Sequence, residues 1–187
     1  SVGATSALTA LLAGGALVAF ALSARLLGRG ADPFRVAAMG ALLGLPAFSA
    51  VIFSAPLGSA LMFRAGVCLI GFGGGLFAVG TLSAAMTLER PAHVGLALGA
   101  WGAVQATAAG ASVAAGGAIR DLVSSLATQG LLGGALASPV TGYSFVYHLE
   151  LYLLFAALVA LGPLVRSNTA RRNPRPAPGF GLADLPG

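Results

Sequence analysis

The chain has 187 residues, of which 57% are hydrophobic and only 8% are charged. A water-soluble domain carries charge on roughly a quarter of its residues, so this composition excludes one and indicates an integral membrane protein. The net charge of +5 comes from arginines at the ends of apolar runs and in the C-terminal tail, which favours membrane orientation over nucleic-acid binding as their role.

Continuous apolar runs of about twenty residues predict an all-α membrane protein. The expected spans cover residues 2–24, 36–55, 61–86, 94–119 and 145–165, followed by an Arg/Pro-rich tail at 166–187. Because Ser1 leads directly into the first apolar run, we expect the chain to be part of a longer protein.

The loop after the first span carries a helix-start signal. The Asp32 carboxylate can accept amide hydrogens at a helix N-terminus, and Pro33 is tolerated at the first helical position. The second span is therefore expected to begin here, beside a group of basic residues, Arg25, Arg29 and Arg35.

The second and third spans are rich in glycine. Gly40 and Gly44 form a GxxxG pattern in the second span, and the third contains the run GFGGGLF, with Gly73 and Gly74 at its centre. Such glycines favour close helix packing or a local break beside a bound molecule. Gly73 and Gly74 are therefore candidate ligand contacts.

The fourth span, with the uncharged stretch 95–117, is expected to organise the bundle. Small residues recur along it at four-residue spacing and predict close packing against other helices: Gly102, Ala106, Gly110 and Ala114. Gln105 lies near its middle and requires a partner, either on another helix or on a ligand carbonyl. Trp101 is either core packing or the wall of a flat pigment site.

The connection from Arg120 and Asp121 to Tyr143 is too apolar for a free loop, so part of it is expected to lie at the membrane interface. Three tyrosines then form an aromatic group at the start of the fifth span: Tyr143, Tyr147 and Tyr152. The Arg/Pro-rich tail is expected to be disordered or polyproline-like.

The arginines predict the orientation. Eight fall on one side of the membrane, namely Arg25, Arg29, Arg35, Arg90, Arg166, Arg171, Arg172 and Arg175, and two, Arg64 and Arg120, fall on the other. Positive charge is retained in the cytoplasm, so the first loop, the loop at Glu89–His93 and the C-terminus are expected to be cytoplasmic.

Few ionisable side chains fall within the spans. His148 and Glu150 are expected near the non-cytoplasmic face. They form either an interfacial polar cluster or a functional site, in which the two residues handle protons or His148 is an axial ligand to a chlorin magnesium. Arg64 either reaches the interface or pairs with Glu150 or Asp121.

The sequence contains no nucleophile elbow, paired deep carboxylates, HExxH or P-loop, and Asp32, Asp121 and Asp184 are isolated. These patterns do not favour an enzyme, and no metal-site spacing is evident.

Two stretches resemble known families. The loop GRGADPFR, with Gly28, Asp32 and Arg35, resembles the second copy of the cytoplasmic motif of major facilitator superfamily transporters, although Pro33 stands where a basic residue is usual. In that register, the five spans are similar to the C-terminal helices eight to twelve of a facilitator bundle. Residues 63–110, with their glycine and tryptophan pattern, resemble the C-terminal half of the PucC/LhaA family of phototrophic bacteria.

This second resemblance implies an assembly factor for bacterial light-harvesting complexes, LH1 or LH2, in the photosynthetic inner membrane. It implies bacteriochlorophyll or carotenoid as bound cofactor, and antenna polypeptides, the reaction centre–LH1 complex and lipids as partners. The alternative is a facilitator-type secondary transporter of a solute or tetrapyrrole. That alternative calls for a deep, coupled carboxylate, which these spans are not expected to contain.

Overall fold

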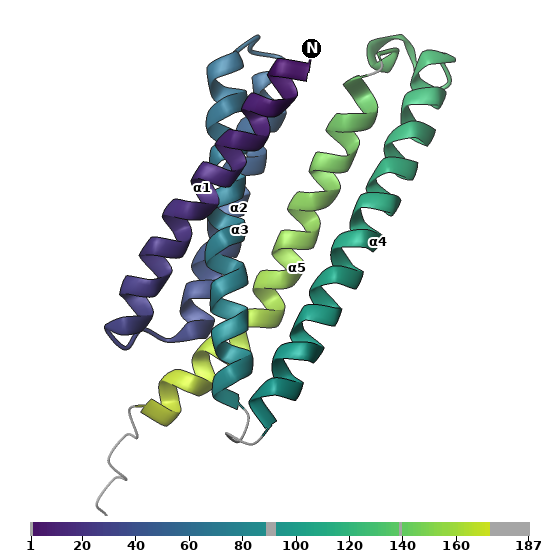
Figure 1. The fold of residues 1–187 in the computed structure, drawn as a ribbon. Helices are drawn as coiled ribbons and strands as arrows, with labels where there is room; N and C mark the ends of the chain where they lie inside the picture. Colours follow the sequence, from purple (N-terminus) through teal and green to yellow (C-terminus); the bar gives the residue numbers. More distant parts are fainter. Residues whose placement is uncertain (1, 89–92, 139, 173–187) are drawn as a thin grey trace, which may run out of the picture.

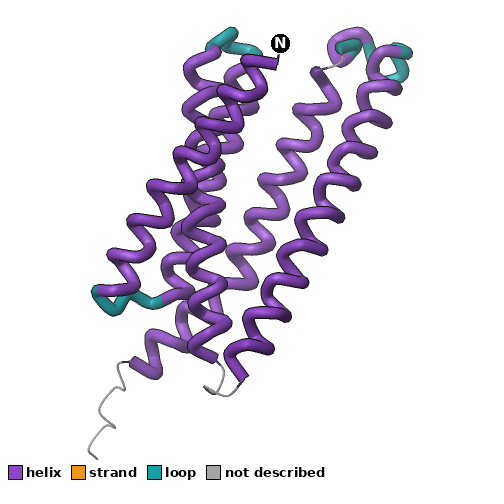
Figure 2. Tube along the Cα trace, in the orientation of Figure 1, coloured by secondary structure: helices purple, strands orange, loops and turns teal. Residues whose placement is uncertain are grey.

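The chain forms five long helices. The computed structural model describes residues 2–88, 93–138 and 140–172, and no strand occurs in these ranges. The helices are α1 (Val2–Gly28), α2 (Pro33–Ser54), α3 (Ala60–Leu88), α4 (Val94–Thr128) and α5 (Val140–Arg172), with a short 3₁₀ helix at Gly134–Leu136. Each long helix contains a stretch long and apolar enough to cross a membrane. The predicted all-α membrane class is confirmed, and Figure 2 shows the helices joined by short loops.

Three ends of the last two long helices differ from the sequence-based expectation. Helix α4 continues through Arg120 and Asp121 to Thr128, because these two charges pair with each other and the chain after them is again rich in helix-compatible apolar residues, beginning with Leu122. Helix α5 begins at Val140 and runs on to Arg172, so its last turns occupy the start of the expected tail. The long interfacial connection is therefore mostly helix. The rest of the tail, 173–187, lies outside the described residues, as does the segment 89–92.

Glycines on α3 allow α1, α2 and α3 to pack with their backbones in contact. A methyl group at Gly73 would lie 2.8 Å from the Gly40 carbonyl oxygen of α2, and one at Gly71 would overlap the Leu12 carbonyl of α1. Gly75 likewise faces Ala19 of α1. Close backbone approach is the main source of helix association in lipid, so the glycine run serves packing and α3 continues through it without a break.

Helices α4 and α5 lie side by side and join this three-helix group through α5 (Figure 1). Leu154 of α5 packs on Gly44, at the middle of α2. Helix α4 touches α3 where the Trp101 indole N–H donates to the Thr81 hydroxyl at 3.2 Å. The fold therefore has a tight group, α1–α3, and a more exposed pair, α4–α5.

The small-residue stripe on α4 does not pack as expected. A methyl group at Gly102 or Gly110 would meet nothing within 4 Å among the described residues. Helix α4 instead contacts its neighbours through a different face, which carries Trp101 and Gly116. Within this chain the stripe is an open surface, and the prediction that it organises the bundle is wrong.

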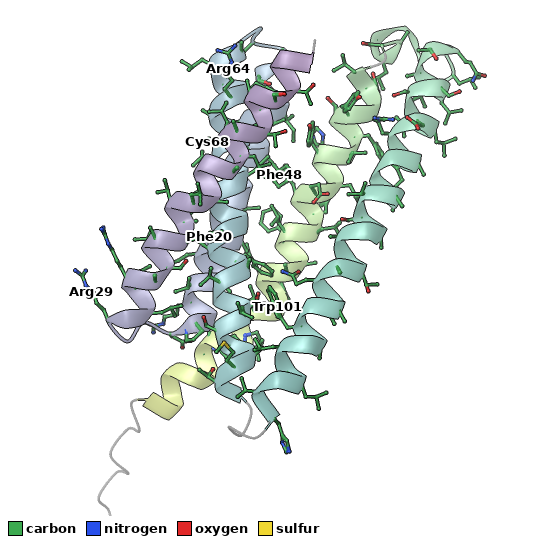
Figure 3. All side chains as sticks on the ribbon, viewed as in Figure 1. Phe20, Arg29, Phe48, Arg64, Cys68 and Trp101 are labelled. Carbon is green, nitrogen blue, oxygen red and sulfur yellow. The ribbon has the colours of Figure 1, made fainter. Side chains whose placement is uncertain are left out.

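The two ends of the bundle carry different arginines. Figure 3 shows Arg29, in the loop between α1 and α2, at the opposite end of the bundle from Arg64 at the start of α3. Arg25 and Arg35 flank the same loop as Arg29. This arrangement matches the alternation of loops on which the orientation was predicted.

Candidate functional site

A groove of about 380 Å³ runs between α4 and α5. Its polar lining residues are Ser112, Arg120, Tyr143, Tyr147 and Glu150. The apolar part of its wall consists of small or branched residues, Val113, Gly116, Gly117 and Val146. We call this set the α4–α5 groove. Polar groups converging on an apolar cleft are typical of a ligand site.

Arg120 is held in place at one end of the groove. Its Nε donates to Asp121 Oδ1 at 2.9 Å, and its Nη1 donates to the Tyr143 hydroxyl at 3.2 Å. The guanidinium carbon also lies 5.2 Å from the centre of the Tyr143 ring, within range of a cation–π contact. Asp121 is thus paired with its neighbour and not with Arg64, and no ion pair joins Arg64 to Glu150 in the described residues.

Glu150 lies deeper in the bundle than the sequence suggested. It is one helical turn, about 6 Å, from Leu154, which packs at the middle of α2. Its side chain is half-buried in the α4–α5 groove, without a hydrogen bond or ion pair among the described residues. The earlier start of α5 accounts for this depth. Glu150 is therefore a carboxyl group inside the segment able to span the membrane, and it has no partner among the residues that the structure describes.

A second cavity of about 260 Å³ lies behind the groove, between α2, α3 and α5. Tyr143 and Tyr147 line both spaces, so the two tyrosines form the wall between them. The Tyr147 ring packs against Phe48 of α2, with ring centres 6.2 Å apart. Two of the three tyrosines predicted to form an interfacial group thus shape two cavities.

His148 does not share the groove with Glu150. Two residues along a helix correspond to about 200° of rotation, so the two side chains leave α5 on nearly opposite faces. His148 is exposed, and its Nδ1 lies 2.7 Å from the carbonyl oxygen of Ser144. The predicted proton-handling pair is therefore not assembled.

The remaining candidates lie elsewhere in the fold. Trp101 is bonded to Thr81 near the other end of α4. Gln105, one turn further on, is half-buried and has no hydrogen bond to described residues. Gly73 is buried against α2 and is not accessible to a ligand, whereas Gly74 is open. The predicted site residues thus divide among at least three places.

The helix start at Asp32 and Pro33 forms as predicted. Asp32 precedes α2, and its Oδ1 accepts the Phe34 N–H at 2.9 Å, with Pro33 at the start of the helix. Asp32 is only 4% exposed, and its second oxygen has no partner in the described residues. Gly30, with φ of 83°, provides the turn that glycine favours. Gly28 ends α1, and Arg35 lies exposed in the first turn of α2.

Sequence reasoning missed the role of Arg120. The drop in hydropathy at Arg120 and Asp121 suggested a span end, yet the apolar residues after them were the available signal that the helix continues. In the described ranges no group of three or more His, Cys, Asp or Glu could hold a metal ion. A ligand at the groove would instead meet one guanidinium, one carboxyl group and two phenols.

Comparisons with known proteins give a consistent result. A protein-family model described as "PUCC protein" matches residues 1–169. The chain is 50% identical over 188 residues to an uncharacterized protein in the puhA-bchM intergenic region of Rhodobacter capsulatus, covering 99% of this chain and 39% of that protein.

Two relatives bear the name Protein PucC. The chain is 45% identical over 168 residues to the one from Cereibacter sphaeroides, covering 90% of this chain and 36% of that protein. It is 57% identical over 123 residues to the one from Rhodovulum sulfidophilum, covering 66% of this chain and 27% of that protein. The chain therefore spans less than two fifths of the length of these relatives, and no solved structure matches it.

Proposed function

The chain belongs to the PUCC protein family, and from this premise we propose that it is part of a membrane assembly factor for bacterial light-harvesting complexes. In this role the protein binds or delivers bacteriochlorophyll, or a carotenoid, and accompanies antenna polypeptides into LH1 or LH2. The family match over residues 1–169 is the observation that carries the proposal. Enzymatic chemistry is not part of it.

The surfaces of α4 and α5 support the proposal. The open glycines of α4 would let a flat or helical guest approach the backbone closely, since a methyl group at Gly102 or Gly110 meets nothing within 4 Å. The same two helices carry Gln105 and Glu150, and neither side chain has a hydrogen bond or ion pair within the described residues. Each could meet a carbonyl or hydroxyl group of a bound pigment or polypeptide.

The donor set also fits a bacteriochlorophyll. The central magnesium of a chlorin accepts one axial ligand, so no multi-residue metal cluster is required. A neutral imidazole is a common metal ligand in proteins. His148 is exposed on α5, inside the segment able to span the membrane. The macrocycle would supply the visible absorption, while the chain would hold it and keep water away.

We propose a bacterial inner-membrane location, in the photosynthetic intracytoplasmic membrane, with the C-terminus cytoplasmic and with a facilitator-type arrangement in the full-length protein. The separation of Arg29 and Arg64 to opposite ends of the bundle supports this orientation (Figure 3).

Copurification tests the assembly role. The full-length protein would be isolated in mild detergent from cells making light-harvesting complexes, and its absorption and associated polypeptides recorded. We expect bacteriochlorin or carotenoid absorption and antenna polypeptides in the same fraction. A fraction without pigment and without antenna would contradict the proposal.

Glu150 favours a second function, proton-coupled transport of a solute or tetrapyrrole. It is a half-buried carboxyl group about 6 Å from the level of the middle of α2, and it lines a groove that also contains Arg120. Flux into proteoliposomes driven by a proton gradient, and lost in Glu150→Gln, would support transport. Equal flux in both proteins, or none in either, would count against it.

A further inference from the structure

The hydrogen bond of His148 determines which ring nitrogen is available. The carbonyl oxygen of Ser144 can only accept a hydrogen bond, so Nδ1 must carry the hydrogen that bridges the 2.7 Å distance. In a neutral imidazole the other nitrogen, Nε2, then has a free lone pair. A metal-ligating histidine has this arrangement, in which the second nitrogen donates to a backbone carbonyl and so fixes the tautomer and the ring.

The position of His148 makes an unsatisfied imidazole costly. It lies six residues, about 9 Å, along α5 from Leu154, which packs at the middle of α2. The hydrocarbon core extends about 15 Å from its centre, so His148 falls inside it. No described residue bonds Nε2, and the side chain is exposed. A polar nitrogen at this depth requires a partner from outside the described chain.

Aromatic side chains surround His148 on the same face of α5. Phe145, Tyr152 and Phe155 lie three residues before, four after and seven after it, which places all of them on one side of a helix. They are 53%, 71% and 56% exposed. Helices α2 and α4 contact α5 elsewhere, through Leu154 and Val146. We call His148 and these three aromatic residues the α5 outer face.

We propose that His148 is the axial ligand of a magnesium tetrapyrrole that lies flat on the α5 outer face. This inference rests on the proposed function, that the protein handles bacteriochlorophyll. The imidazole supplies the fifth ligand through Nε2. The aromatic rings one turn to either side contact the macrocycle, which is broader than a single turn. A pigment held there is exposed to the lipid side of this chain, so it can move to an antenna helix without passing through the bundle.

A comparison of pigments with and without magnesium tests this assignment in the full-length protein. Bacteriochlorophyll a and metal-free bacteriopheophytin a would be titrated into the purified wild type and His148→Leu in detergent. We expect His148→Leu to weaken bacteriochlorophyll a binding at least about tenfold, equivalent to about 1.4 kcal/mol, and to leave bacteriopheophytin a binding within about twofold. Resonance Raman spectra should lose the five-coordinate signature of the magnesium.

Matched variants separate ligation from general effects. His93→Leu replaces the other histidine of the chain and should leave both titrations unchanged. If His148→Leu does not fold, His148→Ala with added imidazole replaces it, and imidazole should restore bacteriochlorophyll a binding.

The outcomes distinguish this inference from the function on which it rests. A wild type that binds bacteriochlorophyll a, with a His148→Leu variant that binds it equally and keeps the five-coordinate signature, overturns only the assignment of His148. A wild type that binds neither pigment overturns the proposed pigment handling together with the inference.

Discussion

The contact between Gly40 of α2 and the backbone of α3 allows a quantitative test of the packing. A methyl group at Gly40 would lie 2.5 Å from the Gly73 carbonyl oxygen and 2.6 Å from the Phe77 nitrogen. Both neighbours are backbone atoms, so neither can rotate away. An ordinary contact begins at 3.4 Å, and α2 and α3 would therefore have to separate by nearly 1 Å to accept Gly40→Ala.

The expected cost follows from two opposing effects. Overpacking costs about 1–3 kcal/mol, and two backbone overlaps place Gly40→Ala at the upper end of that range. Alanine is favoured over glycine within a helix by about 1 kcal/mol. The net loss in unfolding free energy should be about 2 kcal/mol.

Gly74→Ala is the matched control. Gly74 is on α3 next to Gly73, the residue that faces Gly40, but a methyl group at Gly74 meets nothing within 4 Å. This variant should be unchanged or more stable by up to about 1 kcal/mol. Both free energies of unfolding can be measured by unfolding the full-length variants in mixed micelles and monitoring the loss of helix by circular dichroism. If Gly40→Ala is as stable as Gly74→Ala, the close approach of α2 and α3 is refuted.

Three further predictions concern single contacts and orientation. Trp101→Phe should lower the free energy of unfolding by about 0.5–1.5 kcal/mol. In a double-mutant cycle in micelles, Trp101→Phe should cause no further loss once Thr81→Val has removed the hydrogen-bond acceptor. Additive losses from the two substitutions would contradict the hydrogen bond. Asp32→Ala should cost about 0.5–2 kcal/mol in the same assay and Asp32→Asn clearly less, because asparagine also caps helices; equal losses would exclude capping as the cause. Orientation can be tested with single cysteines in a Cys68→Ala background. A membrane-impermeant thiol reagent should label Arg29→Cys only from the cytoplasmic side and Leu57→Cys only from the opposite side. Labelling of both variants from one side would rule out the proposed orientation.

Hydropathy was sufficient to predict the five membrane helices and their order. It failed at the end of α4, because hydropathy counts Arg120 and Asp121 as two separate charges, whereas in the fold they form an ion pair with each other. The capping of α2 by Asp32 is local to four residues, and the sequence predicted it correctly. A helix cap of this kind is thus visible in the sequence.

Contacts between helices were predicted less well. Gly73 and Gly102 occur in similar small, apolar surroundings, yet Gly73 is buried because Gly40 faces it, and Gly102 is open because nothing does. The sequence around each glycine cannot show which one is buried, because burial depends on how two separate helices align with each other. The division of His148 and Glu150 between opposite faces of α5 was available from helical periodicity alone, and only their closeness in sequence suggested a shared site.

The packing also limits where a guest can bind in this chain. Gly40, Gly71 and Gly73 bring the backbone of α3 too close to those of α1 and α2 for a macrocycle to enter on either side of it. The larger groove, its Glu150 carboxyl group and the exposed His148 all belong instead to α4 and α5. Substitutions in the α1–α3 contacts should therefore act through stability, whereas substitutions on α4 and α5 should alter binding in a protein that still folds. The proposed pigment and transport functions thus involve opposite faces of the same helix, α5, so substitutions of His148 and of Glu150 can be compared to separate them.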